Sequence, residues 1–247
     1  MNAGGQTPDI FYDRALAWIH DQYYGQIARD ASVAILRLLQ GGDPAGQLVV
    51  DLGCGTGILA SALSDNGYDV LGVDVSQAML EIATRCSPKA RFVQASLFHF
   101  FIPHCKAVVA IGEPISYLSG EKNENHAVRN LFWHIHEQLE HGGSFVFDIL
   151  TTEAEEGGQT RIVEREDMTM FIHISIDPGS RVLTREMTFF TWEGYGFAKH
   201  REIHRQQLYN RKDIETLLSE TGFRFTAVDR YDAQPFRTGH MGFICRK

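Results

Sequence analysis

The chain has 247 residues, is 44% hydrophobic and carries a formal net charge of −8. This length can bury one substantial core and is short of the size at which chains usually divide, so we expect one domain over residues 1–247. The balance of 31 acidic against 23 basic residues argues against nucleic acid as a partner. A small-molecule substrate is favoured, although a local basic patch is compatible with an acidic total.

The four cysteines are scattered and form no CxxC pair, which favours reduced thiols in a cytoplasmic protein. Residues 1–9 lack the basic start and the apolar stretch of a signal peptide. No apolar run approaches the roughly 18 to 20 residues that cross a bilayer. We therefore predict a cytoplasmic protein without a membrane partner.

Apolar side chains recur at helical spacing over residues 9–40, and the run Gly41-Gly42-Asp43-Pro44 ends the pattern. Two helices are expected there, within an opening unit of residues 1–45. Short apolar runs and helical patterns then alternate from residue 46 to residue 150. The expected strands are 48–50, 68–73, 91–93, 107–111 and 144–149, and the expected helices are 58–63, 76–85 and 124–141. This alternation predicts an α/β fold with a doubly wound, mostly parallel sheet.

The pattern changes after residue 150. An acidic, glycine-containing segment is followed by alternating apolar and polar residues over 168–176, 181–192 and 197–209, which predicts a three-stranded antiparallel meander. We interpret residues 151–210 as an antiparallel β insertion after the fifth strand. Its aromatic residues could cap a substrate or form a homodimer interface. Residues 211–247 are expected to supply a closing helix and the last two strands.

A glycine-rich loop, Asp51-Leu52-Gly53-Cys54-Gly55-Thr56-Gly57, joins the first strand to a helix and lets the backbone approach a ligand closely. A dinucleotide site would have a third glycine where Ile58 stands, and a P-loop would need a Gly-Lys-Ser/Thr run that is absent. Asp74, at the end of the second strand, could accept hydrogen bonds from both hydroxyls of a ribose. Capping of the next helix is the alternative role for Asp74.

This loop, together with residues 70–80, resembles the class I S-adenosylmethionine-dependent methyltransferases. The resemblance continues through 91–96, 109–113 and 139–143, while 15–21 and 208–223 resemble a bacterial branch that methylates small molecules such as amino-sugars. It implies a Rossmann-like fold, S-adenosyl-L-methionine as the cofactor, residues 46–150 as the cofactor-binding core, and the opening helices as a lid over the cofactor.

The resemblance also implies roles for individual residues. Gly53, Cys54 and Gly55 would line the methionine portion of the cofactor, and Asp74 would hold its ribose. Many relatives carry an aspartate where Ser96 stands, and a neutral hydroxyl accepts from the adenine amino group more weakly. The cofactor-binding residues implied are Tyr12, Asp51, Gly53, Cys54, Gly55, Asp74, Val75, Ala95, Ser96, Leu97, Ile111, Gly112 and Glu113.

Methyl transfer from a sulfonium requires a nucleophile in line with the sulfur, so positioning supplies much of the acceleration. A base is needed only where the acceptor must lose a proton. The candidate bases or orienting groups are Glu113, Tyr117, His20, Tyr24 and His204. Basic side chains that could receive an anionic group are Arg201, His204, Arg237 and His240, with solvent exposure as the alternative. No recognisable ligand set accompanies the eleven histidines, so no metal is expected.

We therefore expect a methyltransferase that methylates nitrogen or oxygen, rather than carbon, on a small-molecule acceptor. One alternative is a non-catalytic S-adenosylmethionine-binding sensor or scaffold protein. Another is a nicotinamide-dependent oxidoreductase. The identity of the acceptor does not follow from these residues, because function depends on the site that a fold carries and not on the fold.

Overall fold

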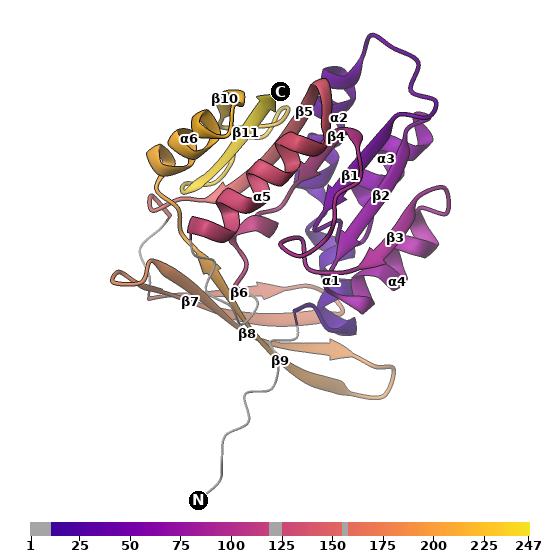
Figure 1. Cartoon of the computed structure of the whole chain (residues 1–247). Coiled ribbons are helices and arrows are strands. Elements are labelled where there is room, and N and C mark those ends of the chain that lie inside the picture. The colour runs from indigo at the N-terminus through magenta and orange to yellow at the C-terminus, as the bar shows by residue number, and fades with distance from the viewer. Residues whose placement is uncertain (1–10, 119–124, 155–157) are drawn as a thin grey trace, which may run out of the picture.

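The computed structural model describes residues 11–118, 125–154 and 158–247, which form a seven-stranded sheet and a separate four-stranded sheet (Figure 1). The order in the larger sheet is β10-β11-β5-β4-β1-β2-β3. Its strands are β1 (Leu48–Leu52), β2 (Asp69–Asp74), β3 (Arg91–Gln94), β4 (Cys105–Ala110), β5 (Leu139–Leu150), β10 (Arg224–Val228) and β11 (His240–Arg246). Strands β1 to β5 pair in parallel and β11 runs antiparallel to both neighbours. The predicted doubly wound, mostly parallel sheet is confirmed.

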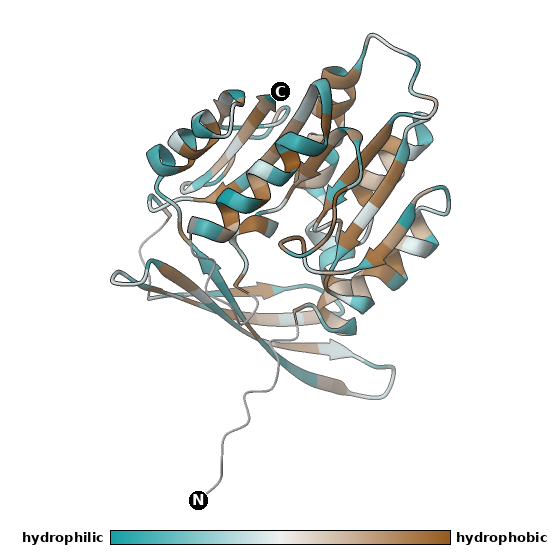
Figure 2. Cartoon of the chain, viewed as in Figure 1, coloured by the Kyte–Doolittle hydropathy of each residue, from teal (hydrophilic) through white to brown (hydrophobic). Residues whose placement is uncertain are grey.

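The central strands are apolar on both faces because helices cover both. Val50 and Val108 belong to one core with residues of α5 (Asn125–Gln138) and α6 (Arg211–Glu220). Val49 and Val109 point the other way, into a core with residues of α2 (Gln26–Leu39) and α3 (Ile58–Asp65). Figure 2 shows hydrophobic strands between helices whose outer faces are hydrophilic. Burial on both sides explains why the sequence of these strands reads as a continuous apolar run.

Polar side chains cap the two remaining long helices. The carboxylate of Asp13 accepts from the backbone N–H groups of Ala15 and Leu16 at the start of α1 (Arg14–Tyr23). The hydroxyl of Ser76 accepts from Met79 N at the start of α4 (Gln77–Cys86). These bonds satisfy donors that have no partner within the helix. Both caps lie beside the ends of the strands, so they also fix where the helices begin relative to the sheet.

The four-stranded sheet has the order β6-β7-β8-β9 and packs below the carboxyl ends of the parallel strands (Figure 1). Its strands are β6 (Gln159–Glu164), β7 (Met168–Asp177), β8 (Val182–Trp192) and β9 (Phe197–Gln207). The buried face of this sheet meets α1, where Leu16 and Ile19 pack against Met170 and Phe189. At the end of β9, Leu118 N donates to Arg205 O at 2.9 Å and ties the two sheets together.

Two local predictions were wrong. The insertion contains a fourth strand, β6, which is largely exposed and pairs with β7 along its whole length at the edge of the sheet. The helix expected over 124–141 ends earlier, at Gln138, and Gly142 and Gly143, which follow the expected helix in the sequence, lie inside β5. A Cβ on Gly143 would meet Lys106 O and Glu140 O, where the pairing of β4 with β5 shifts register. The backbone of β5 comes too close to that of β4 there for a side chain.

The division of the chain into a lid, a core, an insertion and a closing unit stays a prediction, as does a homodimer interface on the insertion. Phe189 is fully buried, whereas Phe171, Trp192 and Tyr195 on or beside the same sheet are exposed. None of the helices within the described ranges is long and apolar enough to cross a membrane.

We expect Phe147→Ala in β5 to lower the free energy of unfolding by about 3 to 5 kcal/mol. Phe147 is 0% exposed and stacks between Phe145 and Phe243, with ring centroids 4.5 Å and 5.1 Å away. Phe101→Ala is the matched control, because Phe101 is 73% exposed and its loss is expected to change stability by less than about 0.5 kcal/mol. Urea unfolding followed by circular dichroism measures both, and equal losses would contradict the assignment of Phe147 to the core.

Candidate functional site

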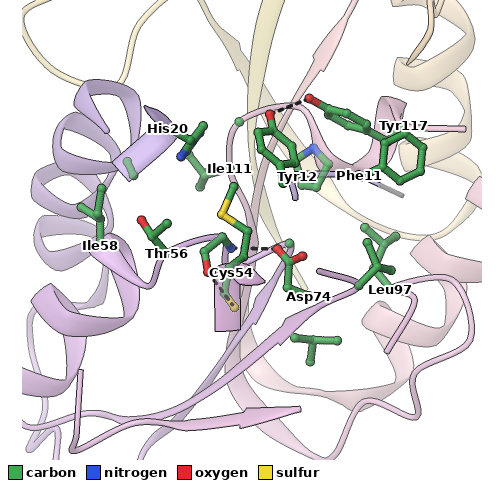
Figure 3. A pocket seen from close by; sticks show the side chains of 18 of the residues that line it. Phe11, Tyr12, His20, Cys54, Thr56, Ile58, Asp74, Leu97, Ile111 and Tyr117 are labelled. Atoms are coloured by element: carbon green, nitrogen blue, oxygen red, sulfur yellow. Dashed lines mark hydrogen bonds between the residues drawn. The ribbon is translucent and has the colours of Figure 1, made fainter. Parts of the chain in front are cut away.

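The glycine loop between β1 and α3 forms one wall of a cavity at the carboxyl edge of the larger sheet (Figure 3). Gly53 has a φ of 77° and lies against Pro114, where a Cβ would collide. Gly55 has a φ of 53°, and a Cβ there would meet no atom within 4 Å. Gly53 thus lets the loop pack against the turn after β4, while Gly55 leaves bare backbone facing the cavity.

Asp74, at the end of β2, holds this loop in place. Its carboxylate accepts a hydrogen bond from Gly55 N at 2.9 Å (Figure 3) and another from Ser76 N at 2.8 Å. Burial raises the pKa of Asp74, and the backbone hydrogen bonds oppose that shift. Because the side chain also lines the cavity, its carboxylate is placed to accept from hydroxyl groups of a ligand on the loop.

A second buried carboxyl group lies behind the loop. Asp51 is 2% exposed, and its Oδ2 has no hydrogen-bond partner among the residues that the structure describes. Burial, together with the nearby charge of Asp74, raises the pKa of Asp51 to about 7. Two carboxyl groups beneath bare backbone favour a ligand that carries positive charge, as a sulfonium cofactor with an ammonium group does.

The cavity contains most of the residues predicted to hold the cofactor. Asp51 lies behind the wall, and Glu113 lines a neighbouring cavity instead. The predicted residues that line the first cavity are Tyr12, Gly53, Cys54, Gly55, Asp74, Val75, Ala95, Ser96, Leu97, Ile111 and Gly112. The hydroxyl of Ser96 accepts from Phe98 N at 3.3 Å, so this hydroxyl also orders its own turn.

Sequence reasoning missed several side chains of this wall. They are mostly apolar and come from elements far apart in the chain, which are Phe11, Ala28, Met79, Phe98 and Pro114. Thr56 and Ile58, in contrast, belong to the glycine loop and the helix after it, and could have been found from their position alone. An apolar side chain carries no chemical signal by which a sequence distinguishes a ligand contact from ordinary packing.

Aromatic residues from the opening segment close one end of the cavity. The hydroxyls of Tyr12 and Tyr117 are hydrogen-bonded at 2.9 Å (Figure 3). Burial raises the pKa of both phenols above the usual value, so both are neutral hydrogen-bonding groups at neutral pH. The ring of Phe11 meets that of Tyr117 edge-on at 5.5 Å.

Glu202 of β9 anchors that opening segment. Its carboxylate accepts from Tyr12 N and Asp13 N, both at 2.8 Å, and lies 2.8 Å from His204 Nε2. On the other side, the carbonyl of Tyr12 accepts from the hydroxyl of Ser76 at 2.8 Å. Tyr12 has a φ of 54°. Residues with a side chain rarely adopt positive φ, and these hydrogen bonds stabilise that conformation here. The opening segment is thus fixed to both sheets.

A second cavity of about 500 Å³ lies between the larger sheet and the inner face of the four-stranded sheet. Its apolar wall comes from α1, β7 and β8 and includes Leu16, Met170, Ile172 and Met187. The residues that line both cavities are Tyr12, His20, Tyr24, Ile27, Gly112 and Tyr117. The two cavities therefore meet at one shared wall.

Glu113 reaches the second cavity because Asp148 holds the turn after β4. The Asp148 carboxylate is fully buried and accepts from Gly112 N, Glu113 N and the hydroxyl of Tyr231. Glu113 has a φ of 67°, which these bonds support. Burial opposes ionisation of Glu113, but the nearby charges of Arg237 and His240 lower its pKa below the usual value. Glu113 is therefore an ionised carboxylate in the wall.

All five candidate catalytic residues line the second cavity, and His20, Tyr24 and Tyr117 line both. In both His20 and His204, the Nδ1 atom is buried and has no hydrogen-bond partner within the described parts of the chain. His204 offers its Nε2 to Glu202. His20 lies between the rings of Tyr12 and Tyr24, with centroids 5.4 Å and 6.4 Å away. Burial lowers the pKa of His20, which is neutral at neutral pH.

Three of the four basic residues considered for an anionic group, His204, Arg237 and His240, line the second cavity. For Arg201 the alternative of solvent exposure holds, because its side chain is 61% exposed and pairs with Glu186 at 2.9 Å instead of lining the cavity. Sequence reasoning missed Arg185 of β8, which lines this cavity. Alternation along the strand could have found it, since Arg185 shares a face with Met187 and Phe189.

Within residues 11–118, 125–154 and 158–247, no group of three or more His, Cys, Asp and Glu side chains could hold a metal ion.

Comparisons with known proteins agree with this architecture. A family profile described as a methyltransferase domain matches residues 49–143. A Geobacillus sp. (strain WCH70) protein named as a candidate methyltransferase is 29% identical, over 94% of this chain and 98% of its own length. A Bacillus subtilis (strain 168) protein with the same kind of name is 27% identical, over 76% of this chain and 78% of its own length.

Solved structures share the fold over nearly the whole chain. An S-adenosylmethionine-dependent methyltransferase from Clostridium acetobutylicum has a TM-score of 0.80 at 20% identity, covering 94% of this chain and 97% of its own. CalS10, an amino pentose methyltransferase from Micromonospora echinaspora solved with S-adenosylmethionine bound, has a TM-score of 0.73 at 18% identity. The match covers 98% of this chain and 99% of CalS10. The sugar N-methyltransferase KedS8 from Streptoalloteichus has a TM-score of 0.72 at 19% identity, and the match covers 100% of this chain and 99% of KedS8.

We expect Asp74→Asn to weaken the binding of S-adenosylhomocysteine by about 10- to 100-fold, because the substitution removes a charged acceptor at the loop. Isothermal titration calorimetry measures the dissociation constant. Asp69→Asn, at the exposed start of the same strand, is the control and is expected to bind like the parent protein. A loss of less than about twofold in Asp74→Asn would contradict the role of this carboxylate.

The raised pKa of Asp51 predicts a pH dependence of stability. Its carboxyl group titrates near 3.8 when unfolded and at about 7 when folded, so the folded state holds an extra proton between these values. The free energy of unfolding should fall as pH rises through this window, by up to about 1.4 kcal/mol per pH unit, and this contribution should be constant above it. Asp51→Asn should flatten that slope.

Urea unfolding at several pH values measures this slope. Asp65→Asn is the control, because Asp65 is exposed and pairs with Lys89 at the surface. Its profile should run parallel to that of the parent protein. Equal slopes for the parent protein and Asp51→Asn would show that Asp51 does not titrate in this range.

Proposed function

We propose that this chain, which is an S-adenosylmethionine-dependent methyltransferase, methylates a nitrogen or oxygen atom of a small molecule bound in the second cavity. The shared wall of the two cavities is the observation that supports this proposal most. A volume of about 500 Å³ is typical of sites for small molecules. The net charge of −8 also disfavours a nucleic acid acceptor.

The bound cofactor supplies an electrophilic methyl group on a sulfonium. The protein's own contribution is to hold the two reactants against one another. Gly55 and Asp74 fix the loop beneath the first cavity, and Tyr12 and Tyr117 join the two cavities through their hydroxyl pair. Positioning of this kind is the main source of acceleration for a transfer between two bound molecules.

His20 is the residue we propose as the base. It lines both cavities, its Nδ1 is buried with no partner among the described residues, and burial lowers its pKa, so the neutral ring can accept a proton. Tyr12 and Tyr24 hold the ring on two sides. A base at this wall suits an ammonium or hydroxyl acceptor, each of which must lose a proton.

The described activities of two structural relatives support the same class of acceptor. CalS10 is described as an amino pentose methyltransferase and KedS8 as a sugar N-methyltransferase. These relatives resemble this chain in fold only. The proposal that a nitrogen or oxygen atom is methylated therefore rests first on His20. The apolar wall of Leu16, Met170 and Met187 favours an acceptor with an apolar portion.

Incubation of the purified protein with methyl-labelled S-adenosylmethionine and a metabolite extract tests the proposal. We expect a labelled small molecule, detected by mass spectrometry, with the label on nitrogen or oxygen. An Asp74→Asn sample is the matched control and should form less product. The absence of a labelled product from protein that binds S-adenosylhomocysteine would favour the sensor or scaffold alternative.

With the acceptor found in this way, we expect His20→Asn to lower kcat by about 100- to 10,000-fold. Binding of S-adenosylhomocysteine should change little, because the cofactor loop remains intact. In the parent protein kcat should fall at acidic pH, with a midpoint below the usual histidine pKa of about 6.5, since burial lowers the pKa of His20. The variant should lack this fall.

His126→Asn is the control for this substitution, because His126 lies exposed on α5 and lines neither cavity. Its kcat and pH profile are expected to match those of the parent protein. An unchanged kcat in His20→Asn would refute a base role for His20.

A further inference from the structure

Arg185 lies on the inner face of the four-stranded sheet, at the wall of the second cavity. Its neighbours in register are Ile174 on β7 and His204 on β9. Ile174, Met187 and His204 line the same cavity, so the neighbours of Arg185 on its own sheet are apolar side chains and an imidazole. A cation in such a place is costly when it loses water without gaining a counter-charge.

Arg185 has no carboxylate partner among the described residues, because no ion pair joins it to an Asp or Glu there. The neutral phenol of Tyr117 lies close to it and lines the same cavity. Burial acts against its charge, but the influence of Tyr117 and Glu113 raises the pKa of Arg185 above the usual value. Arg185 is therefore a cation at all pH values of interest.

Glu113, the carboxylate whose charge acts on Arg185, is engaged elsewhere. Glu113 pairs with Arg237, accepts from Gln206 Nε2 at 3.0 Å and lies 3.5 Å from His240 Nδ1. Of Arg185 and Arg237, which both line this cavity, Arg185 is thus the one that has no carboxylate partner among the described residues. Tyr117, which lies close to Arg185, belongs to the wall shared with the cofactor cavity.

We infer that the acceptor carries an anionic group, a carboxylate or a phosphate ester, which pairs with Arg185. This inference rests on the proposed function of the second cavity. A neutral acceptor that filled the cavity would strip water from the guanidinium and leave it unpaired, whereas an anion would compensate that loss. The planar guanidinium can bind either group through two parallel hydrogen bonds. Because Tyr117 lies close to Arg185 and is hydrogen-bonded to Tyr12 in the shared wall, the anionic group lies close to the atom that receives the methyl.

Binding of simple probes tests this without knowledge of the acceptor. The full chain is saturated with S-adenosylhomocysteine and titrated by calorimetry with benzoate, phenyl phosphate and the neutral analogue benzamide. We expect at least one anion to bind about 10- to 100-fold more tightly than benzamide. Comparison of benzoate with phenyl phosphate identifies which anion the site prefers. Equal affinity for benzamide, or failure of both anions to bind, overturns the inference.

Variants assign any such binding to Arg185. Arg185→Gln should bind the preferred anion about as weakly as the parent protein binds benzamide. The affinity of Arg185→Lys for this anion should lie between those of Arg185→Gln and the parent protein. Arg201→Gln is the matched control, since Arg201 is exposed and paired with Glu186, and it should not differ from the parent protein. An unchanged dissociation constant for S-adenosylhomocysteine shows that each variant is folded. Retention of anion binding by folded Arg185→Gln overturns the inference.

The extract assay separates this inference from the function on which it rests. A labelled product without an acidic group would overturn the role of Arg185 and leave the small-molecule methyltransferase intact. Anion binding that depends on Arg185, without any labelled product, would support the anion site and count against the proposed transfer.

Discussion

Buried carboxylates that accept backbone N–H groups hold the segments around the two cavities in place. Asp74 accepts from Gly55, Asp148 accepts from Gly112 and Glu113, and Glu202 accepts from Tyr12 and Asp13. Tyr12 and Glu113 have positive φ, which residues with side chains adopt only when other contacts support it. Charge-assisted bonds are the stronger hydrogen bonds, so they can maintain this backbone.

The residues that hold the backbone of the site in place are different from those that are available to its ligands. The anchoring carboxylates are engaged with the backbone, while the groups that face the cavities retain capacity for ligands. Within the described residues, His20 keeps a buried nitrogen without a partner and Arg185 keeps a charge that no carboxylate pairs with. The shared wall can therefore serve cofactor and acceptor together, since its shape does not depend on either ligand. A site that is already shaped loses less entropy when its ligands bind.

Local signals in the chain predicted the first cavity well. A glycine loop after an apolar strand and an aspartate at the end of the next strand are brought together by parallel pairing of β1 with β2, which any doubly wound sheet provides. The same signals failed for β6, a short and largely exposed edge strand paired with β7, and for Gly142 and Gly143, which lie inside a strand. Where pairing across the fold decides the structure, local propensity is a weak guide.

Sequence patterns are sufficient to predict the parallel α/β core, the glycine loop and the carboxylate beside it, because each depends on residues close together in the chain or in adjacent strands. Only the folded structure shows that Asp148 supports the turn at Glu113 and that Glu202 anchors the opening segment. These contacts join residues 35 and 190 positions apart. No local pattern encodes such a pairing, since it follows from how the two sheets pack against each other.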